Sequence, residues 1–298
     1  MEPLVSVLMT SYNREEFIGE AIQSVLSSTY KNFELIIVDD GSIDNTVPIA
    51  RSFEAKDQRV KLYINEKNLT QFPNRNKAAS YATGKYIKYF DSDDIMFPHC
   101  LAVMVSAMEK FPDAGVGAIT KNSHLRNVQL PQKYSSRESL INHYFTDSEL
   151  LFIGPSGTIF RKDVFFEYKG FNEKIGILTD TLLMLSIASK YPVVGFETGL
   201  FHWRLHDQQV TIGQQDWFEM QKQRYEINRI ILNSRDIPLT KKEVNIIKRN
   251  VKNIFIRNII RTLFCNRSFH KCYELNEFGK IKFWDYPAAA IPNQKLEA

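Results

Sequence analysis

The stretch Leu4–Ser42, LVSVLMTSYNREEFIGEAIQSVLSSTYKNFELIIVDDGS, predicts a strand, a helix and a second strand with short connections. The run Leu4–Tyr12 is rich in β-branched residues and ends in small polar ones, which predicts a buried strand. Residues 14–28 carry apolar side chains at helical spacing. A second apolar run begins at Phe33 and is stopped by two adjacent aspartates and a glycine. This strand–helix–strand unit favours a parallel sheet.

The same alternation continues along the chain. Further strands are expected at Val60–Glu66, Tyr86–Phe90 and Gly115–Thr120, within Gly154–Phe165, and at 192–197. Further helices are expected at Asn74–Gly84, closed by its glycine, at Pro98–Phe111, begun by its proline, and at Thr179–Tyr191. Short connections between alternating strands and helices predict a doubly wound, largely parallel α/β sheet with helices on both faces.

Two regions depart from this alternation. Residues Lys121–Leu150 are polar and are expected to form an irregular lid or an acceptor-binding insertion. From Gln214 onward only helical patterns remain, the clearest in residues 241–264. The predicted organisation is therefore an α/β domain over residues 1–213 and a helical, basic extension over 214–298.

Composition limits the class of protein. The chain has 298 residues, 44% hydrophobic and 24% charged, which is typical of a folded protein rather than a disordered one. Its three cysteines are scattered, which favours a reduced, intracellular chain. The N-terminus lacks the features of a secretory signal, and no window reaches about 18 apolar residues without charge. A cytoplasmic protein without a membrane-spanning helix is expected.

The polar residues that follow the predicted strands form a candidate site. Parallel strands present their carboxyl ends at one edge, where ligands of such sheets gather. The residues concerned are Thr10, Tyr12, Asp39, Asp40, Asp91 and Asp93. Asp91, Asp93 and Asp94 stand within four positions, and carboxylates this close repel one another. Either this cluster is a solvated loop or it binds something cationic.

Three ordered blocks of sequence resemble the family 2 glycosyltransferases of the GT-A fold. They are residues 5–46, residues 74–94 and the segment running from Gly154 to Ile187. The resemblance spans about Leu4 to Ile187 and implies an inverting, metal-dependent enzyme that uses a nucleotide-sugar. It also implies a nucleotide-sugar half at about 1–98 and an acceptor half at about 99–213.

The resemblance assigns the donor site. Asp91 and Asp93 form its D-x-D motif; on an extended segment both carboxylates would point to one side and could meet one Mn²⁺ or Mg²⁺. Asp93 would be the direct ligand, and Asp91 would contact ribose or a metal-bound water. Asp40 would bind the N–H of a uracil-type base, which favours a UDP-sugar, while Thr10 and Tyr12 would contact base and ribose. Strand-end packing is the alternative for the last two.

Four more residues are candidates on the same grounds. Arg75 matches an arginine near the nucleotide, although it could instead pair with an acid at the sheet edge. Ser92, inside the D-x-D, is included among the donor-binding residues. Arg204 and His206 lie in FHWRLHDQQ, where family members carry a loop that closes over the diphosphate. Arg204 suits phosphate oxygens and His206 a phosphate or the metal; a structural histidine is the alternative.

Asp180 is the candidate catalytic base. Inverting transfer needs one carboxylate to take the proton of the acceptor hydroxyl, and the metal-bound diphosphate leaves without a protonated acid. The family usually has Glu-Asp here, whereas this chain has Thr179-Asp180. The base is present and its usual neighbour is not. An aspartate that merely begins a helix is the alternative.

The basic extension has two interpretations. From Lys241 to Lys271 there are nine Lys or Arg and one acid, Glu243, between apolar residues at helical spacing. Such helices could lie on an anionic membrane surface, at its inner face, where lipid-linked acceptors reside. They could equally pack on their own domain or on a sister subunit. Nucleic acid is disfavoured because aromatic residues do not alternate with the charge.

Three functions compete. The first is a glycosyltransferase that moves a sugar to a glycan, polyol-phosphate or lipid-linked acceptor in cell-surface polysaccharide synthesis. The second is a GT-A-like binding or scaffold protein that has lost catalysis, which Thr179 keeps open although the acids are intact. The third, a sugar nucleotidyltransferase, needs a glycine-rich loop after the first strand, and TSYNREE has no glycine.

Overall fold

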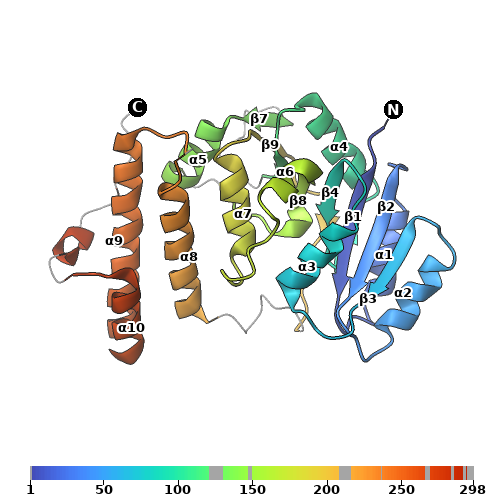
Figure 1. The fold of residues 1–298 in the computed structure, drawn as a ribbon, viewed down its shortest axis with the longest axis horizontal. Helices are drawn as coiled ribbons and strands as arrows, with labels where there is room; N and C mark the ends of the chain where they lie inside the picture. Colours follow the sequence, from blue (N-terminus) through green and yellow to red (C-terminus); the bar gives the residue numbers. More distant parts are fainter. Residues whose placement is uncertain are drawn as a thin grey trace.

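The computed structural model describes residues 2–120, 130–146, 150–207, 216–235, 237–265, 269–282, 285–290 and 293. A sheet with the strand order β3-β2-β1-β4-β8-β6-β9-β7 forms its centre, and β5 and β10 form a small second sheet. Figure 1 shows the sheet and its covering helices to one side, with α8, α9 and α10 gathered beyond α7. The strands are β1 (Val5–Ser11), β2 (Phe33–Asp39), β3 (Val60–Ile64), β4 (Tyr86–Tyr89), β5 (Ile95–Met96), β6 (Val116–Ile119), β7 (Gln132–Tyr134), β8 (Thr158–Arg161), β9 (Val193–Phe196) and β10 (Phe201–His202).

The sheet is mixed and largely parallel. β1 pairs in parallel with β2 and β4, and β2 with β3. β8 enters antiparallel between β4 and β6, and β7 runs antiparallel to β9 at the far edge. Because β1, β2 and β4 are parallel neighbours, the residues that follow each of them lie at one edge of the sheet. The predicted fold class is confirmed.

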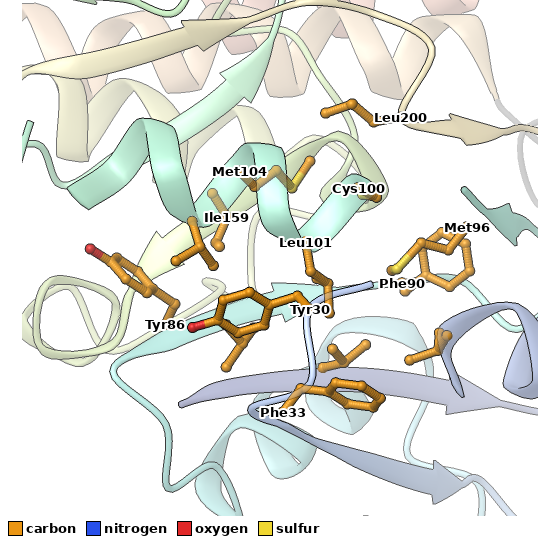
Figure 2. Close-up of a cluster of buried hydrophobic side chains, with 14 of the residues drawn as sticks. Tyr30, Phe33, Tyr86, Phe90, Met96, Cys100, Leu101, Met104, Ile159 and Leu200 are labelled. Atoms are coloured by element: carbon orange, nitrogen blue, oxygen red, sulfur yellow. The ribbon is translucent and has the colours of Figure 1, made fainter. Parts of the chain in front are cut away.

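Helices cover both faces of the sheet, because strand residues alternate between two cores. Their bounds are α1 (Ile18–Leu26), α2 (Thr46–Glu54), α3 (Gln71–Ser80), α4 (Cys100–Lys110), α5 (Ser136–Phe145), α6 (Lys162–Glu167), α7 (Thr179–Ala188), α8 (Trp217–Leu232), α9 (Lys241–Cys265) and α10 (Phe269–Gly279), with the 3-10 turns η2 (Pro155–Gly157) and η4 (Pro287–Ala290). Val7 belongs to the core under α1, α2 and α4, whereas the next residue, Leu8, belongs to the core under α3, α6 and α7. Figure 2 shows the first core, with Leu101 and Met104 of α4 in the same apolar layer as Tyr86 and Phe90.

The C-terminal helices continue the second core. Ile227 and Ile231 of α8 are buried in the same cluster as the α7 side chains. Helices α9 and α10 form a third cluster around Phe255, Ile259 and Leu275. The apolar side of the extension therefore packs against its own chain. The boundary expected at 213/214 falls within 208–215, outside the described residues.

Two expectations about local structure are wrong. The helix expected at Asn74–Gly84 is α3, which begins three residues earlier and ends at Ser80, so Gly84 does not close it. The stretch expected to be irregular, Lys121–Leu150, contains β7 and α5; its residues 121–129 and 147–149 lie outside the described residues. A capping box begins α5: Ser135 accepts from the Glu138 backbone N–H while Glu138 binds back, a signal readable in the sequence.

No helix in the described part of the chain combines the length and apolarity that crossing a membrane requires.

Candidate functional site at the carboxyl edge of the sheet

The acids after β4 lie in a turn. The backbone N–H of Asp94 donates to the carbonyl of Asp91 (3.2 Å), and residues 92–93 form the turn between them. The expectation of an extended segment is therefore wrong, because this hydrogen bond closes the chain on itself. Ser92 is buried within the turn. Asp91 and Asp93 consequently have separate sets of partners.

Asp91 is held from two sides. Its Oδ1 accepts a hydrogen bond from Nη2 of Arg75 at 2.5 Å, and its Oδ2 accepts from the Ser156 hydroxyl at 2.9 Å. The same hydroxyl accepts from the Asp91 backbone N–H (3.1 Å), so Ser156 binds the residue twice. Arg75 lies on α3 and Ser156 on η2, each remote in sequence from Asp91. Arg75 therefore pairs with an acid at the sheet edge, the alternative given in the sequence analysis, and that acid belongs to the D-x-D motif itself.

Asp93 meets the segment that follows β10. Its Oδ2 lies 3.1 Å from Nε2 of His206 and 3.2 Å from Nε of Arg14. The other oxygen, Oδ1, has no hydrogen bond to any described residue. The His206 ring stacks on Phe17 (4.4 Å between centroids), and its Nδ1 is buried without a partner in the described chain.

Arg204 lies beside this group. Its guanidinium forms an ion pair with Glu20 of α1 and stands 5.5 Å above the ring of Phe17. Its backbone N–H donates to Oδ1 of Asp94 at 3.2 Å. The predicted loop residues Arg204 and His206 are therefore brought to the acid turn, and the antiparallel pairing of β10 with β5, next to that turn, carries them there.

A buried lysine lies beneath the turn. Lys88 of β4 is fully buried, and its ammonium donates to the carbonyls of Tyr89 (2.8 Å) and Ser156. Burial lowers the pKa of Lys88 to about 8, although the nearby Asp91 and Asp94 oppose the change. The pKa of Asp94 is raised to about 7, chiefly by burial and then by the negative charges of Asp91 and Asp93. Lys88 thus supplies positive charge under three crowded acids and ties β4 to η2.

The two aspartates that end β2 have different environments. Asp39 is fully buried and accepts hydrogen bonds from Ser11, from the Gly41 backbone and from both the backbone and hydroxyl of Ser42, which holds the following loop. Asp40 accepts from Asn65 (2.8 Å) and from the backbone of Leu69 (2.8 Å) at Oδ1.

The second carboxylate oxygen of Asp40, Oδ2, can accept a further hydrogen bond. Oδ2 accepts one bond in the described chain, from the Thr70 backbone at 3.0 Å, and a carboxylate oxygen offers two lone pairs. A ligand N–H could therefore still bind there. Thr10 is partly buried near the end of β1, and Tyr12, just beyond it, is 44% exposed. The carbonyl of Tyr12 accepts from Arg14 (3.2 Å), which links it to the Asp93 group.

Asp180 lies in the first turn of α7. Its Oδ1 accepts from the Thr181 backbone at 2.6 Å and from the Thr181 hydroxyl at 3.4 Å. Burial raises the pKa of Asp180, and the charge of Arg75 is among the effects that oppose the rise. The same arginine thus binds Asp91 and acts on Asp180. Thr179 is fully buried, with a hydroxyl that has no partner among the described residues.

Helix α8 fixes the approach to Asp180. Oε1 of Gln223 accepts from the Leu178 backbone N–H (3.1 Å), two residues before the aspartate. Gly176 has φ +92, and a Cβ there would stand 2.5 Å from Nε2 of Gln223. The Gln223 side chain could move aside, but the positive φ would strain any side chain, so this turn favours glycine.

Sequence reasoning missed several residues of the site. Arg14, Lys88 and Ser156 each interact with a predicted site residue through a hydrogen bond or short-range charge, and Gln223 binds the backbone two residues before Asp180. A lysine inside an apolar strand was a signal for Lys88. The other three became visible only through long-range contacts.

The acids do not form a closed metal cage. In the described ranges no group of three or more His, Cys, Asp or Glu side chains is placed to hold a metal ion. Asp93 and His206 are the closest approximation, with a carboxylate oxygen and an imidazole nitrogen at 3.1 Å.

Comparison with known proteins places this geometry in context. The model of Glycosyl transferase family 2 matches residues 6–168. The UDP-Glc:alpha-D-GlcNAc-diphosphoundecaprenol beta-1,3-glucosyltransferase WfgD of Escherichia coli is 39% identical over 143 residues, which are 47% of this chain and 56% of that enzyme. The chain spans about half, or less, of the length of the first curated relatives it matches.

Two solved structures share the fold. TarS 1-349 of S. aureus, in complex with UDP-GlcNAc, has a TM-score of 0.66 at 19% identity, over 96% of this chain and 78% of that one. The mannosyltransferase PcManGT of Pyrobaculum calidifontis, in complex with GDP-Man and Mn²⁺, has a TM-score of 0.62 at 15% identity, over 97% and 86%. At such identities the likeness shows the fold alone.

Proposed function

Since the chain belongs to glycosyltransferase family 2, we propose that it transfers a sugar from a nucleoside diphosphate donor to an acceptor hydroxyl, with inversion at the anomeric carbon. The observation that carries the proposal is the position of Arg75. Its guanidinium binds Asp91 of the acid turn, and its charge acts on Asp180 of α7. One arginine therefore pairs with an acid of the proposed donor site and acts through its charge on the group that can take a proton.

The donor site is the edge that carries Thr10, Tyr12, Asp40 and the acid turn. The free capacity of Asp40 Oδ2 suits the ring N–H of a uracil, which supports a UDP-sugar. TarS is solved with UDP-GlcNAc, and the name of WfgD includes UDP-Glc, whereas PcManGT is solved with GDP-Man. Arg204, Ser92 and Arg75 would contact the donor phosphates and ribose.

A divalent cation fits the residues present. Oδ1 of Asp93 has no hydrogen bond to the described residues, and the imidazole of His206 stands beside the same carboxylate. Mg²⁺ and Mn²⁺ commonly keep few protein ligands and complete their shell with substrate phosphates and water. Asp93 would bind the ion, His206 would support it, and Asp91 would hold a water or the ribose. The bound ion would supply charge stabilisation to the departing diphosphate.

Asp180 would act as the base. As the acceptor oxygen bonds to the anomeric carbon, its proton passes to the Asp180 carboxylate. The bond from that carbon to the diphosphate oxygen breaks, and its electron pair leaves with the nucleoside diphosphate. Burial, which raises the pKa of Asp180, makes its carboxylate a stronger proton acceptor than a solvated one.

The acceptor is proposed to be a glycan, a polyol-phosphate or a lipid-linked sugar of a cell-surface polymer. WfgD, by its name, acts on alpha-D-GlcNAc-diphosphoundecaprenol. Exposed aromatic residues on α9 and α10, including Phe264, Phe269 and Tyr273, are interspersed with basic residues in the sequence and would suit contact with the inner face of a membrane or with a second copy.

A panel of UDP-, GDP- and dTDP-sugars, each with Mn²⁺ and with EDTA, tests the proposal. We expect a metal-dependent thermal shift with one nucleotide and slow hydrolysis of the matching sugar donor. Binding of a donor without hydrolysis or transfer to any acceptor would favour the scaffold function. No binding in any arm would overturn the proposal.

A further inference from the structure

A cavity of about 670 Å³ lies between the catalytic core and the C-terminal helices. Its walls come from α5, α7, α8 and α9 and from Phe152. Figure 1 shows α7 standing between the sheet and α8, so the cavity lies on the side of α7 that faces away from the nucleotide-binding strands. None of the residues assigned to donor binding lines it.

The cavity adjoins the proposed base. Thr181 of α7 lines it, and both the backbone N–H and the hydroxyl of Thr181 donate to Oδ1 of Asp180. On its other side, Asp180 is subject to the charge of Arg75, which binds Asp91. Asp180 is therefore linked to the cavity through Thr181 and to the donor site through the charge of Arg75, and an acceptor in the cavity would lie one residue from the proposed base.

The charge of the lining favours an anion. Arg224 and Arg261 contribute to the walls, and no Asp or Glu does. In the part of the chain that the structure describes, neither arginine forms an ion pair with a carboxylate. Both arginines are exposed, and the guanidinium of Arg224 lies 5.5 Å from the ring centroid of Phe152, which also lines the cavity. Guanidinium groups bind phosphate oxygens in a two-pronged geometry, so two uncompensated arginines point to a phosphate.

The lining also suits a sugar. Trp217 and Tyr225 supply flat apolar surface against which a sugar ring can pack. The amide side chains of Asn228 and Asn258 belong to the same lining, and amides can exchange hydrogen bonds with sugar or polyol hydroxyls.

We propose that this cavity binds a phosphorylated acceptor, with its phosphate on Arg224 and Arg261 and its sugar or polyol part against Trp217 and Tyr225. The proposal rests on the proposed glycosyltransferase function and narrows the acceptor to the phosphorylated classes. A lipid-linked sugar diphosphate and a polyol-phosphate chain share this chemistry. The reacting hydroxyl would project past Thr181 to Asp180.

The test compares arginines inside and outside the cavity. Arg224→Gln and Arg261→Gln remove the lining charges. Arg249→Gln on α9 is the matched control, since Arg249 is also exposed but does not line the cavity, and Arg229→Gln on α8 is a second control that breaks an ion pair with Glu226 outside it. Each variant is assayed with three probes: a GlcNAc diphosphate on a short water-soluble prenyl chain, a ribitol phosphate oligomer, and a phosphate-free GlcNAc glycan. The two phosphorylated probes distinguish the two sources.

We expect each lining variant to raise the acceptor KM about 10-fold for the phosphorylated probe that reacts, because each loses a charge-assisted contact. Donor hydrolysis without acceptor, donor affinity and melting temperature should stay at the wild-type value. The control variants should stay within about twofold of wild type, a difference too small for a lost ionic contact. Unchanged KM in both lining variants, or equal use of the phosphate-free glycan, would overturn the proposal.

Failure of the two proposals can be told apart. If the wild type neither binds nor hydrolyses any donor, the proposed function fails. Equilibrium binding of the same probes, followed by calorimetry, then decides about the cavity alone. If a phosphorylated probe binds the wild type and the controls but not the lining variants, the cavity proposal is supported. If no phosphorylated probe binds the wild type, the cavity proposal is wrong.

Discussion

Nε2 of His206 lies 3.1 Å from Oδ2 of Asp93, although 113 positions separate them in the sequence. The short pairing of β10 with β5 brings the two segments together, with His202 opposite Ile95. The loop that follows β10 therefore lies over the acid turn, and its arginine and histidine reach the place where a diphosphate and its cation would bind.

Asp93→Asn should weaken Mn²⁺-dependent binding of UDP by about 30-fold or more, because a charged oxygen ligand is lost. Calorimetry with and without Mn²⁺ measures this. In EDTA the variant and the wild type should bind UDP equally. Equal affinity in Mn²⁺ would show that the cation, if any, is held elsewhere.

Asp180→Asn should leave donor affinity unchanged and lower turnover by about 10²–10⁴-fold, the usual contribution of a positioned base. Steady-state transfer and a separate donor titration give the two quantities. Asp163→Asn is the matched control, since Asp163 also lies in the first turn of a helix but pairs with Arg161. Turnover close to wild type in Asp180→Asn would place the base at another residue.

Ser156→Ala should raise the donor KM several-fold with little change in the fold. The hydroxyl of Ser156 both donates to the Asp91 carboxylate and accepts from its backbone, so its loss frees the carboxylate to turn away from the donor. Donor KM at saturating acceptor is the measurement. Ser189→Ala, which removes a hydroxyl bonded only to a helix carbonyl, serves as the control. A donor KM that rises equally in both variants would argue against a role for Ser156 in holding Asp91.

Lys88→Met should change how stability depends on pH above 8. Burial lowers the pKa of Lys88 to about 8, whereas the unfolded chain holds this proton up to its ordinary value of 10.5. Unfolding therefore takes up a proton between these values, and the wild-type free energy of unfolding gains up to about 3 kcal/mol as pH rises through this window.

Denaturant unfolding at pH 8 and pH 10.5 checks the Lys88 prediction. The variant should lack this gain, and Lys61→Met, at an exposed position on β3, should keep it. If the free energy of unfolding changes equally with pH in Lys88→Met and in the wild type, the assigned burial of the ammonium is contradicted.

Glu243→Gln should lower stability by about 1–2 kcal/mol near pH 7, a value discounted because Arg137 is half exposed. The carboxylate of Glu243 accepts hydrogen bonds from both terminal nitrogens of Arg137 (2.6 and 2.7 Å) and from the backbone N–H of Thr240. The bonds from Arg137 join α9 to α5. The bonds from Arg137 lower the pKa of Glu243 to about 2, so its contribution is present above pH 4.5 and is lost as pH falls toward 2.

Thermal melting between pH 7 and pH 2 checks the Glu243 prediction. The gap between Glu243→Gln and the wild type should close at the acid end, and a gap that persists at pH 2 would rule out the ionic contribution. Glu226→Gln, from an exposed pair within α8, should show a much smaller effect.

The order of the elements could be predicted because each depends on neighbouring residues. The runs at Leu4–Tyr12 and Phe33–Asp39 predict strands from their own composition, and parallel pairing then brings their polar ends together. Helix α5 was missed although Ser135 and Glu138 form a readable capping box, because the polar composition around them suggested a loop.

The sequence by itself determined which acids are present and which sheet edge carries them, since the order of elements along the chain and the positions where strands end follow from local pattern. Tertiary structure decided what each acid does. The partners of Asp91 and Asp93 come from α3, η2, the connection between β1 and α1, and the loop after β10, and hydrogen bonds at about 3 Å form only once the core has brought those segments together. The cavity beside Asp180 likewise exists only because α8 packs on α7, a contact between surfaces far apart in the chain.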